Sequence, residues 1–138
     1  MRSNFLKSKL HRIKLTDVHI DYEGSCAIDE TILNASDICE YEMLHIYNLA
    51  NGNRFTTYAI KAEKDSGIVS FNGAAAFQGK VNDLIIICTY TQLEASEVKN
   101  HKLLLIIRVY HKWSCTEHKV FVCPTNNYGL VLALLNTS

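Results

Sequence analysis

An Asn-Gly pair between two strand-like segments is the feature that most constrains the fold of this chain. Asn51 and Gly52 both tolerate the positive φ angles that the central positions of a tight β-hairpin turn require. Residues 43–50 and 54–62 flank the pair and have the composition of β-strands. Alternation along the second segment separates two faces, Phe55, Thr57 and Ala59 on one and Arg54, Thr56, Tyr58 and Ile60 on the other. The pair therefore predicts an antiparallel hairpin.

Other parts of the chain show the same kind of pattern. Residues 5–22 alternate at spacing two, with a slip near Thr16 and Asp17 where a turn is expected. A short helix is predicted over residues 30–38, with Asp29 as its N-cap, and residues 72–76 are expected to form a compact loop of small residues. The remaining expected elements are strands over 68–71, 84–90, 103–110 and 119–123 and a brief polar helix over 93–99. Six or more short strands joined by turns indicate a mainly β fold, a small closed or partly closed barrel.

The composition narrows the class of protein. Hydrophobic residues make up 48% of the 138 residues, which is enough for the core of one domain. The 14 basic and 14 acidic residues cancel, which argues against a binder of nucleic acid or of membrane surfaces. We expect a cytoplasmic protein, because no apolar run could span a membrane and no signal peptide is recognisable. The five cysteines are then expected to be buried free thiols.

Four short blocks follow one another in the chain. A Gly-Ser pair such as Gly24-Ser25 normally marks only a turn. The blocks are Lys9-x-His11, Tyr22-Glu23-Gly24-Ser25-Cys26, Asn51-Gly52-x-Arg54-Phe55-x-Thr57-Tyr58 and Asn72-Gly73-Ala74-Ala75-Ala76. Together they resemble the aspartate 1-decarboxylase family of pyruvoyl-dependent enzymes. The resemblance covers residues 7 to about 107, so we divide the chain into a decarboxylase barrel, 1–107, and a C-terminal extension of unknown role, 108–138. It also implies that the barrel is of the double-psi type.

The resemblance implies that the chain cuts itself between Gly24 and Ser25. Ser25 would then become a pyruvoyl group, a covalent cofactor that forms a Schiff base with the substrate. The residue types suit this chemistry, because the hydroxyl of Ser25 can attack the carbonyl of Gly24. Gly24 has no Cβ and so allows the bent backbone that this attack requires.

The resemblance also implies an activity and a set of site residues. The reaction is removal of the α-carboxylate of L-aspartate, giving β-alanine and CO₂ for pantothenate synthesis. Tyr58 is the expected proton donor, and Thr57 is expected to act both in self-cleavage and on the substrate. The other expected substrate-binding residues are Lys9, Arg54, Asn72, Gly73, Ala74 and Ala75, and the supporting residues are His11, Tyr22, Tyr47 and Ile86. Family members form homotetramers with sites between subunits.

Two features of the expected site can be judged from chemistry. The family often has Trp at position 47, and Tyr47 keeps an aromatic wall there. The α-carboxylate must become neutral CO₂, so a strong ion pair on it would stabilise the ground state more than the transition state. We therefore expect Arg54 to hold the side-chain carboxylate and the α-carboxylate to lie in a drier, less paired position. The carboxylate that Lys9 holds is not assigned.

Two other function classes remain as alternatives. A non-enzymatic β-barrel binding module is the first, although the balanced charge and the lack of a basic aromatic stripe disfavour it. A metal or thiol enzyme is the second, because Cys115-x-x-His118 with Cys123 forms part of a ligand pattern. The second half of a zinc site is missing, so we expect no metal.

Overall fold

The computed structural model describes residues 1–111 and 114–124, and the side chains of residues 1–106. The fold is mainly β, as predicted, and nine strands form one sheet in this part of the chain. The strands are β1 Arg2–Lys14, β2 Asp17–His19, β3 Ser25–Asp29, β4 Met43–Asn48, β5 Arg54–Ala62, β6 Val69–Asn72, β7 Leu84–Glu94, β8 Lys102–His111 and β9 Ser114–Pro124. The helical elements are short: α1 Glu30–Ala35 and the 3₁₀ turns η1 Gly73–Gln78 and η2 Val98–Asn100.

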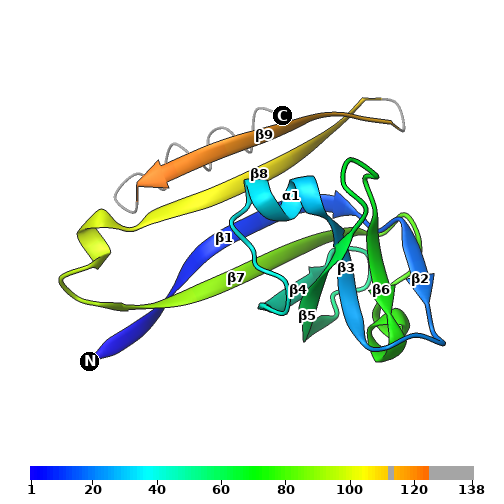
Figure 1. The fold of residues 1–138 in the computed structure, drawn as a ribbon, viewed down its shortest axis with the longest axis horizontal. Helices are drawn as coiled ribbons and strands as arrows, with labels where there is room; N and C mark the ends of the chain where they lie inside the picture. The colour runs from blue at the N-terminus through cyan, green and yellow to red at the C-terminus, as the bar shows by residue number, and fades with distance from the viewer. Residues whose placement is uncertain (112–113, 125–138) are drawn as a thin grey trace.

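The strand order is consistent with a small β-barrel. Neighbouring strands follow the order β2-β6-β3-β5-β4-β7-β1-β8-β9. The first seven strands of this order run from β2 to β1. These two strands are consecutive in the chain and are joined only by Leu15 and Thr16. The backbone N–H of Thr16 donates to the carbonyl of Val69 in β6 over 2.8 Å, so this junction links β1 to the far end of the order. Figure 1 shows the short strands β2 to β6 gathered at one end, with β8 and β9 running beside β1.

Apolar side chains from most of these strands fill one core. Leu10 in β1, Ile46 in β4 and Ile87 in β7 are fully buried, and their registers place them side by side. Phe71 of β6 packs edge to face against Phe55 of β5, with ring centroids 5.2 Å apart. Each fully buried side chain of this size stabilises the fold by about 1.5–3 kcal/mol. The alternation predicted for β5 is confirmed, because Ala59 is buried and Tyr58 partly exposed.

Several local predictions are confirmed and others are wrong. The hairpin about Asn51-Gly52 joins β4 to β5 as predicted, but only Gly52 of the pair has the positive φ expected of both. Asp29 caps α1 by accepting from Thr31 N–H over 2.9 Å. However, α1 ends at Ala35 rather than at residue 38. The polar helix over 93–99 is wrong, because β7 continues to Glu94 and only a 3₁₀ turn follows. The small-residue loop over 72–76 is instead the end of β6 and the start of η1.

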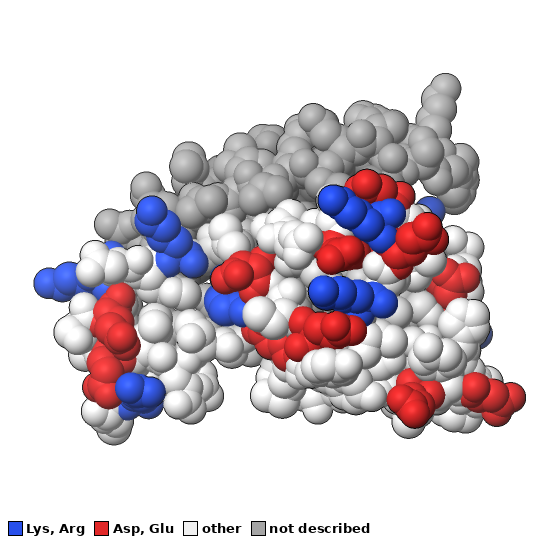
Figure 2. Space-filling view, viewed as in Figure 1, with Lys and Arg blue, Asp and Glu red and all other residues white. Residues whose placement is uncertain are grey.

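The thiols and surface charges complete the description. Cys26 and Cys88 are free and buried as expected, whereas Cys39 is free but exposed because it lies in the loop after α1. Cys115, His118 and Cys123 lie outside the residues whose side chains are described. Acidic and basic side chains are intermixed on the face seen in Figure 2. No helix in the described part of the chain is long and apolar enough to cross a membrane.

Candidate active site

Ser25 is the first residue of β3 and lies in the middle of the sheet. It is 1% exposed and is paired with Asn72 at the end of β6. The side-chain amide of Asn72 donates to Ser25 Oγ over 3.1 Å, and Ser25 Oγ donates to the carbonyl of Glu23 over 3.3 Å. Ser70 Oγ in turn donates to Asn72 Oδ1 over 2.8 Å, which orients the amide. The hydroxyl of Ser25 is therefore fixed against the backbone just before Gly24.

Gly73 packs directly against the backbone of the Tyr22-Glu23-Gly24 segment. Its φ is +63°, in the left-handed region. A Cβ at Gly73 would lie 2.7 Å from Gly24 Cα and 2.7 Å from the carbonyl oxygen of Tyr22, closer than real contacts allow. Only glycine fits both the conformation and the space. We call Gly24, Ser25, Asn72 and Gly73 the serine cluster. Beyond Gly73 in η1, Ala74 is exposed and Ala75 is buried.

Tyr58 and Thr57 lie on opposite faces of β5. The parallel register begins with Cys26 paired with Ala59, and Ser25 and Tyr58 each precede that pair by one position. Thr57 pairs with the fully buried Leu44 and is half-buried on the core face. The side chain of Thr57 makes no hydrogen bond with the described residues. In one chain, Tyr58 is therefore on the same side of the sheet as the serine cluster and Thr57 is not.

The cations expected at the site lie elsewhere, on the outer face of β1, β7, β4 and β5. The guanidinium carbon of Arg54 is 4.0 Å from the centroid of the Tyr47 ring. Tyr47 is paired with Ile86 across β4 and β7, and Lys9 is paired with Cys88 across β1 and β7. We call Lys9, Tyr47, Arg54 and Ile86 the arginine cluster.

The two cations of the arginine cluster act on a common neighbour. Burial raises the pKa of Cys88 above its usual value, while the charges of Lys9 and Arg54 both act to lower it. Both cations are thus close enough to Cys88 to act on its thiol electrostatically.

The serine cluster and the arginine cluster are separated within one chain. Arg54 and Tyr58 are four positions apart on β5, which corresponds to about 13 Å along the strand. The guanidinium of Arg54 is turned onto Tyr47 of β4, whereas Ser25 is in β3, on the other side of β5. The residues expected to form one site therefore form two groups in a single chain.

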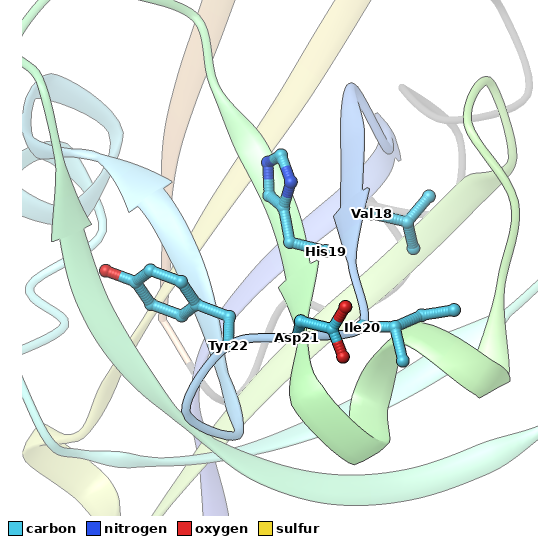
Figure 3. Close-up of a pocket in the computed structure, with 5 residues that line it drawn as sticks. All are labelled: Val18, His19, Ile20, Asp21 and Tyr22. Carbon is cyan, nitrogen blue, oxygen red and sulfur yellow. The ribbon is translucent and has the colours of Figure 1, made fainter.

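The segment before Gly24 lines a pocket. Residues Val18 to Tyr22 line a pocket of about 420 Å³, and Tyr22 is 60% exposed. Figure 3 shows their side chains pointing in different directions, with Tyr22 directed away from Val18 and Ile20. The pocket therefore lies beside the serine cluster and includes none of its residues.

The sequence did not indicate three residues that support the serine cluster or the arginine cluster. Ser70 orients Asn72, Tyr90 donates to or accepts from Tyr47 through its hydroxyl, and the ring of His45 packs edge-on against Tyr90. For Tyr90 a signal existed, since it alternates with Ile86 and Cys88 on the outer face of β7. The strand register that brings it to Tyr47 is not visible in a single sequence.

His11 is a partly buried histidine near the arginine cluster. Its Nδ1 is buried and has no hydrogen-bond partner among the described residues. Burial, followed by the charges of Lys9 and Arg12, lowers its pKa from 6.5 to about 4. His11 is therefore neutral at physiological pH.

Acid should destabilise the folded chain through His11. Between pH 6.5 and about 4 the unfolded chain binds a proton at His11 that the folded chain does not bind. The free energy of unfolding should therefore fall as the pH falls through this window, with no contribution above 6.5. His11→Gln should lose less stability than the parent when urea unfolding is compared at about pH 7 and about pH 4.5. An equal loss in both proteins would contradict this role.

Comparison with known proteins identifies a single family. A family model described as aspartate decarboxylase matches residues 1–112. An aspartate 1-decarboxylase of Nitrosococcus oceani is 56% identical over 106 residues, covering 77% of this chain and 84% of the relative. A protein of the same name from Methylobacillus flagellatus is 54% identical over 106 residues, again covering 77% of this chain and 84% of the relative. Another, from Ralstonia pickettii, is 49% identical over 78% of this chain and 89% of its own length.

Proposed function

The chain belongs to the aspartate decarboxylase family, and from this premise we propose that it matures by cutting itself between Gly24 and Ser25 and then converts L-aspartate to β-alanine and CO₂. The enzyme class, an aspartate decarboxylase, follows from the family. The observation that best supports self-cleavage is the buried hydroxyl of Ser25, held by Asn72 against the backbone that precedes Gly24. We further propose that the β-alanine serves pantothenate synthesis in the cytoplasm.

The cleavage needs only groups of the chain itself and water. Ser25 Oγ attacks the carbonyl carbon of Gly24, the Gly24–Ser25 amide bond breaks, and an ester forms. Loss of the Cα proton of Ser25 expels the carboxylate of Gly24 and leaves a Cα–Cβ double bond. Hydrolysis of the resulting enamine releases ammonia and leaves the ketone of a pyruvoyl group. The contact between Gly73 and Gly24 fixes the segment during these steps.

The residues around Ser25 fit a pyruvoyl group at this position. The group has oxygen acceptors and no hydroxyl, and the amide of Asn72, now donating to Ser25 Oγ, could donate to it. When present, a pyruvoyl carbonyl supplies the electron sink that decarboxylation requires. The chain's own contributions are to exclude water from Ser25, which is 1% exposed, and to place Tyr58 beside it as a proton donor.

We propose that substrate binding uses two chains. The serine cluster and the arginine cluster are separated in one chain, and in a homotetramer one subunit could supply each. Arg54 then holds the side-chain carboxylate of aspartate, and the α-carboxylate stays in a less paired position from which CO₂ can leave. Thr57 and Tyr58, on opposite faces of β5, could serve different subunits in the same way.

Intact mass spectrometry under denaturing conditions tests the maturation. The parent should give two chains, residues 1–24 and residues 25–138, the second without a free amino-terminal amine. Ser25→Ala should give one full-length chain and no β-alanine. A parent that stays full-length after prolonged warming would count against autonomous cleavage.

Tyr58→Phe should separate maturation from turnover. The variant keeps the ring beside Ser25 and loses only the hydroxyl, so it should be cut like the parent. Loss of a general acid typically lowers the rate about 10²- to 10⁴-fold, and kcat should fall by that amount. Steady-state β-alanine formation by fully cut protein measures this. Activity within about threefold of the parent would remove Tyr58 from the mechanism.

A further inference from the structure

Three side chains from three strands form a continuous contact on the outer face of the sheet. The guanidinium of Arg54 in β5 lies 4.0 Å from the centroid of the Tyr47 ring in β4. The hydroxyl of Tyr47 is 2.9 Å from the hydroxyl of Tyr90 in β7. Arg54 is thus connected to β7 through Tyr47, although β5 and β7 are not neighbours in the sheet.

Tyr90 is itself held in place from two sides. The ring of His45 packs edge-on against it, with centroids 4.9 Å apart and an interplanar angle of 83°. Burial and then the bond to Tyr47 raise the pKa of Tyr90 above its usual value, so its hydroxyl stays protonated at physiological pH. Tyr90 is 40% exposed, and the His45 ring and the bond to Tyr47 hold it against β4.

The contact matters because it ends at the guanidinium of Arg54, the group proposed to bind a substrate carboxylate. A free arginine side chain loses rotamer entropy when it binds a carboxylate. A cation over an aromatic face gives up part of that freedom before binding, but only if the ring is itself fixed. The ring of Tyr47 is half-buried, and its hydroxyl end is tied to the neighbouring strand by Tyr90.

We propose that Tyr90 is a positioning residue for substrate recognition, which through the hydroxyl of Tyr47 holds the Arg54 guanidinium ready for a carboxylate of aspartate. This inference rests on the proposed function. Tyr90 acts through Tyr47 and contributes to binding rather than to the chemical step. It should therefore affect KM more than kcat, and it should have no effect on cleavage at Gly24-Ser25.

A double-mutant cycle on fully cut protein tests the inference. Tyr90→Phe and Tyr47→Phe each remove one hydroxyl of the same bond and keep both rings. Each should raise KM for aspartate about threefold to tenfold, with kcat within about twofold of the parent. The double variant should bind no worse than the weaker single variant, because both changes remove one interaction. Tyr41→Phe, which removes a hydroxyl from a residue 73% exposed in the loop before β4, should match the parent.

The outcomes are distinguishable. Values of KM within about twofold of the parent in both single variants would overturn the role of Tyr90, as would effects that multiply in the double variant. A fall in kcat at unchanged KM would also overturn it. A parent that is cut but releases no β-alanine would instead overturn the proposed function, whatever the variants do.

Discussion

Gly73→Ala should nearly abolish cleavage between Gly24 and Ser25, whereas Gly52→Ala should leave it intact. Both glycines have a positive φ, +63° and +77°, so alanine is strained at either position. A Cβ at Gly73 would lie 2.7 Å from Gly24 Cα, while a Cβ at Gly52 would meet nothing within 4 Å. Comparing the two variants therefore separates the effect of backbone strain from the effect of a clash with the segment to be cut.

Cleavage rates measured by intact mass over time check this expectation. Misplacing a reacting group by about 1 Å can slow a reaction about 10²-fold, and Gly73→Ala should slow cleavage by at least that factor. Thermal unfolding of Gly52→Ala shows the stability lost to backbone strain alone, and that of Gly73→Ala shows the loss from strain and clash together. If Gly73→Ala folds and is cut at the parental rate, the close approach of Gly73 to Gly24 plays no part in maturation.

Co-expression of Ser25→Ala with Arg54→Ala should restore activity that neither variant has alone. Ser25→Ala cannot form the pyruvoyl group, and Arg54→Ala should be cut but bind aspartate poorly. In mixed oligomers, a site that takes Ser25 from one subunit and Arg54 from its neighbour is intact in about a quarter of random pairings. The separation of the serine cluster from the arginine cluster in one chain motivates this expectation.

Two different affinity tags allow the mixed oligomers to be purified before β-alanine formation is measured. Ser25→Ala co-expressed with a chain that carries both substitutions is the matched control and should stay inactive, because no intact Ser25 is present. Mass spectrometry must show that the Arg54→Ala chain is cut. Inactive mixed oligomers containing cut Arg54→Ala chains would show that Ser25 and Arg54 act within one chain.

Local signals in the sequence predicted the parts of the fold that are determined locally. The β4–β5 hairpin was predicted from Asn51-Gly52, and Gly52 does take a positive φ there, although Asn51 does not. The short strand β3 was not predicted, because its five residues gain their pairing from β5 and β6, which are far away in the chain. The helix over 93–99 failed for a related reason, since pairing with β1 extends β7 to Glu94.

In the candidate site, too, some features could be predicted from the sequence and others could not. The resemblance assigned Ser25, Asn72 and Gly73 to one site, but it could not indicate that Gly73 is packed on Gly24. It likewise could not indicate the bond between Tyr47 and Tyr90, because the register between β4 and β7 joins residues 43 positions apart. Faces of a strand can be read from alternation; contacts between strands require the fold.

The position of the proposed cut has a consequence for the integrity of the barrel. The Gly24–Ser25 bond lies after β2, at the first residue of β3, so the shorter product carries all of β1 and β2. That strand pairs with β7 on one side and with β8 on the other, and its Leu10 and Ile13 are fully buried in the core. After maturation the molecule is thus a non-covalent complex of two peptides, each incomplete without the other. Its unfolding becomes a dissociation that depends on protein concentration, whereas the uncut precursor unfolds as one chain.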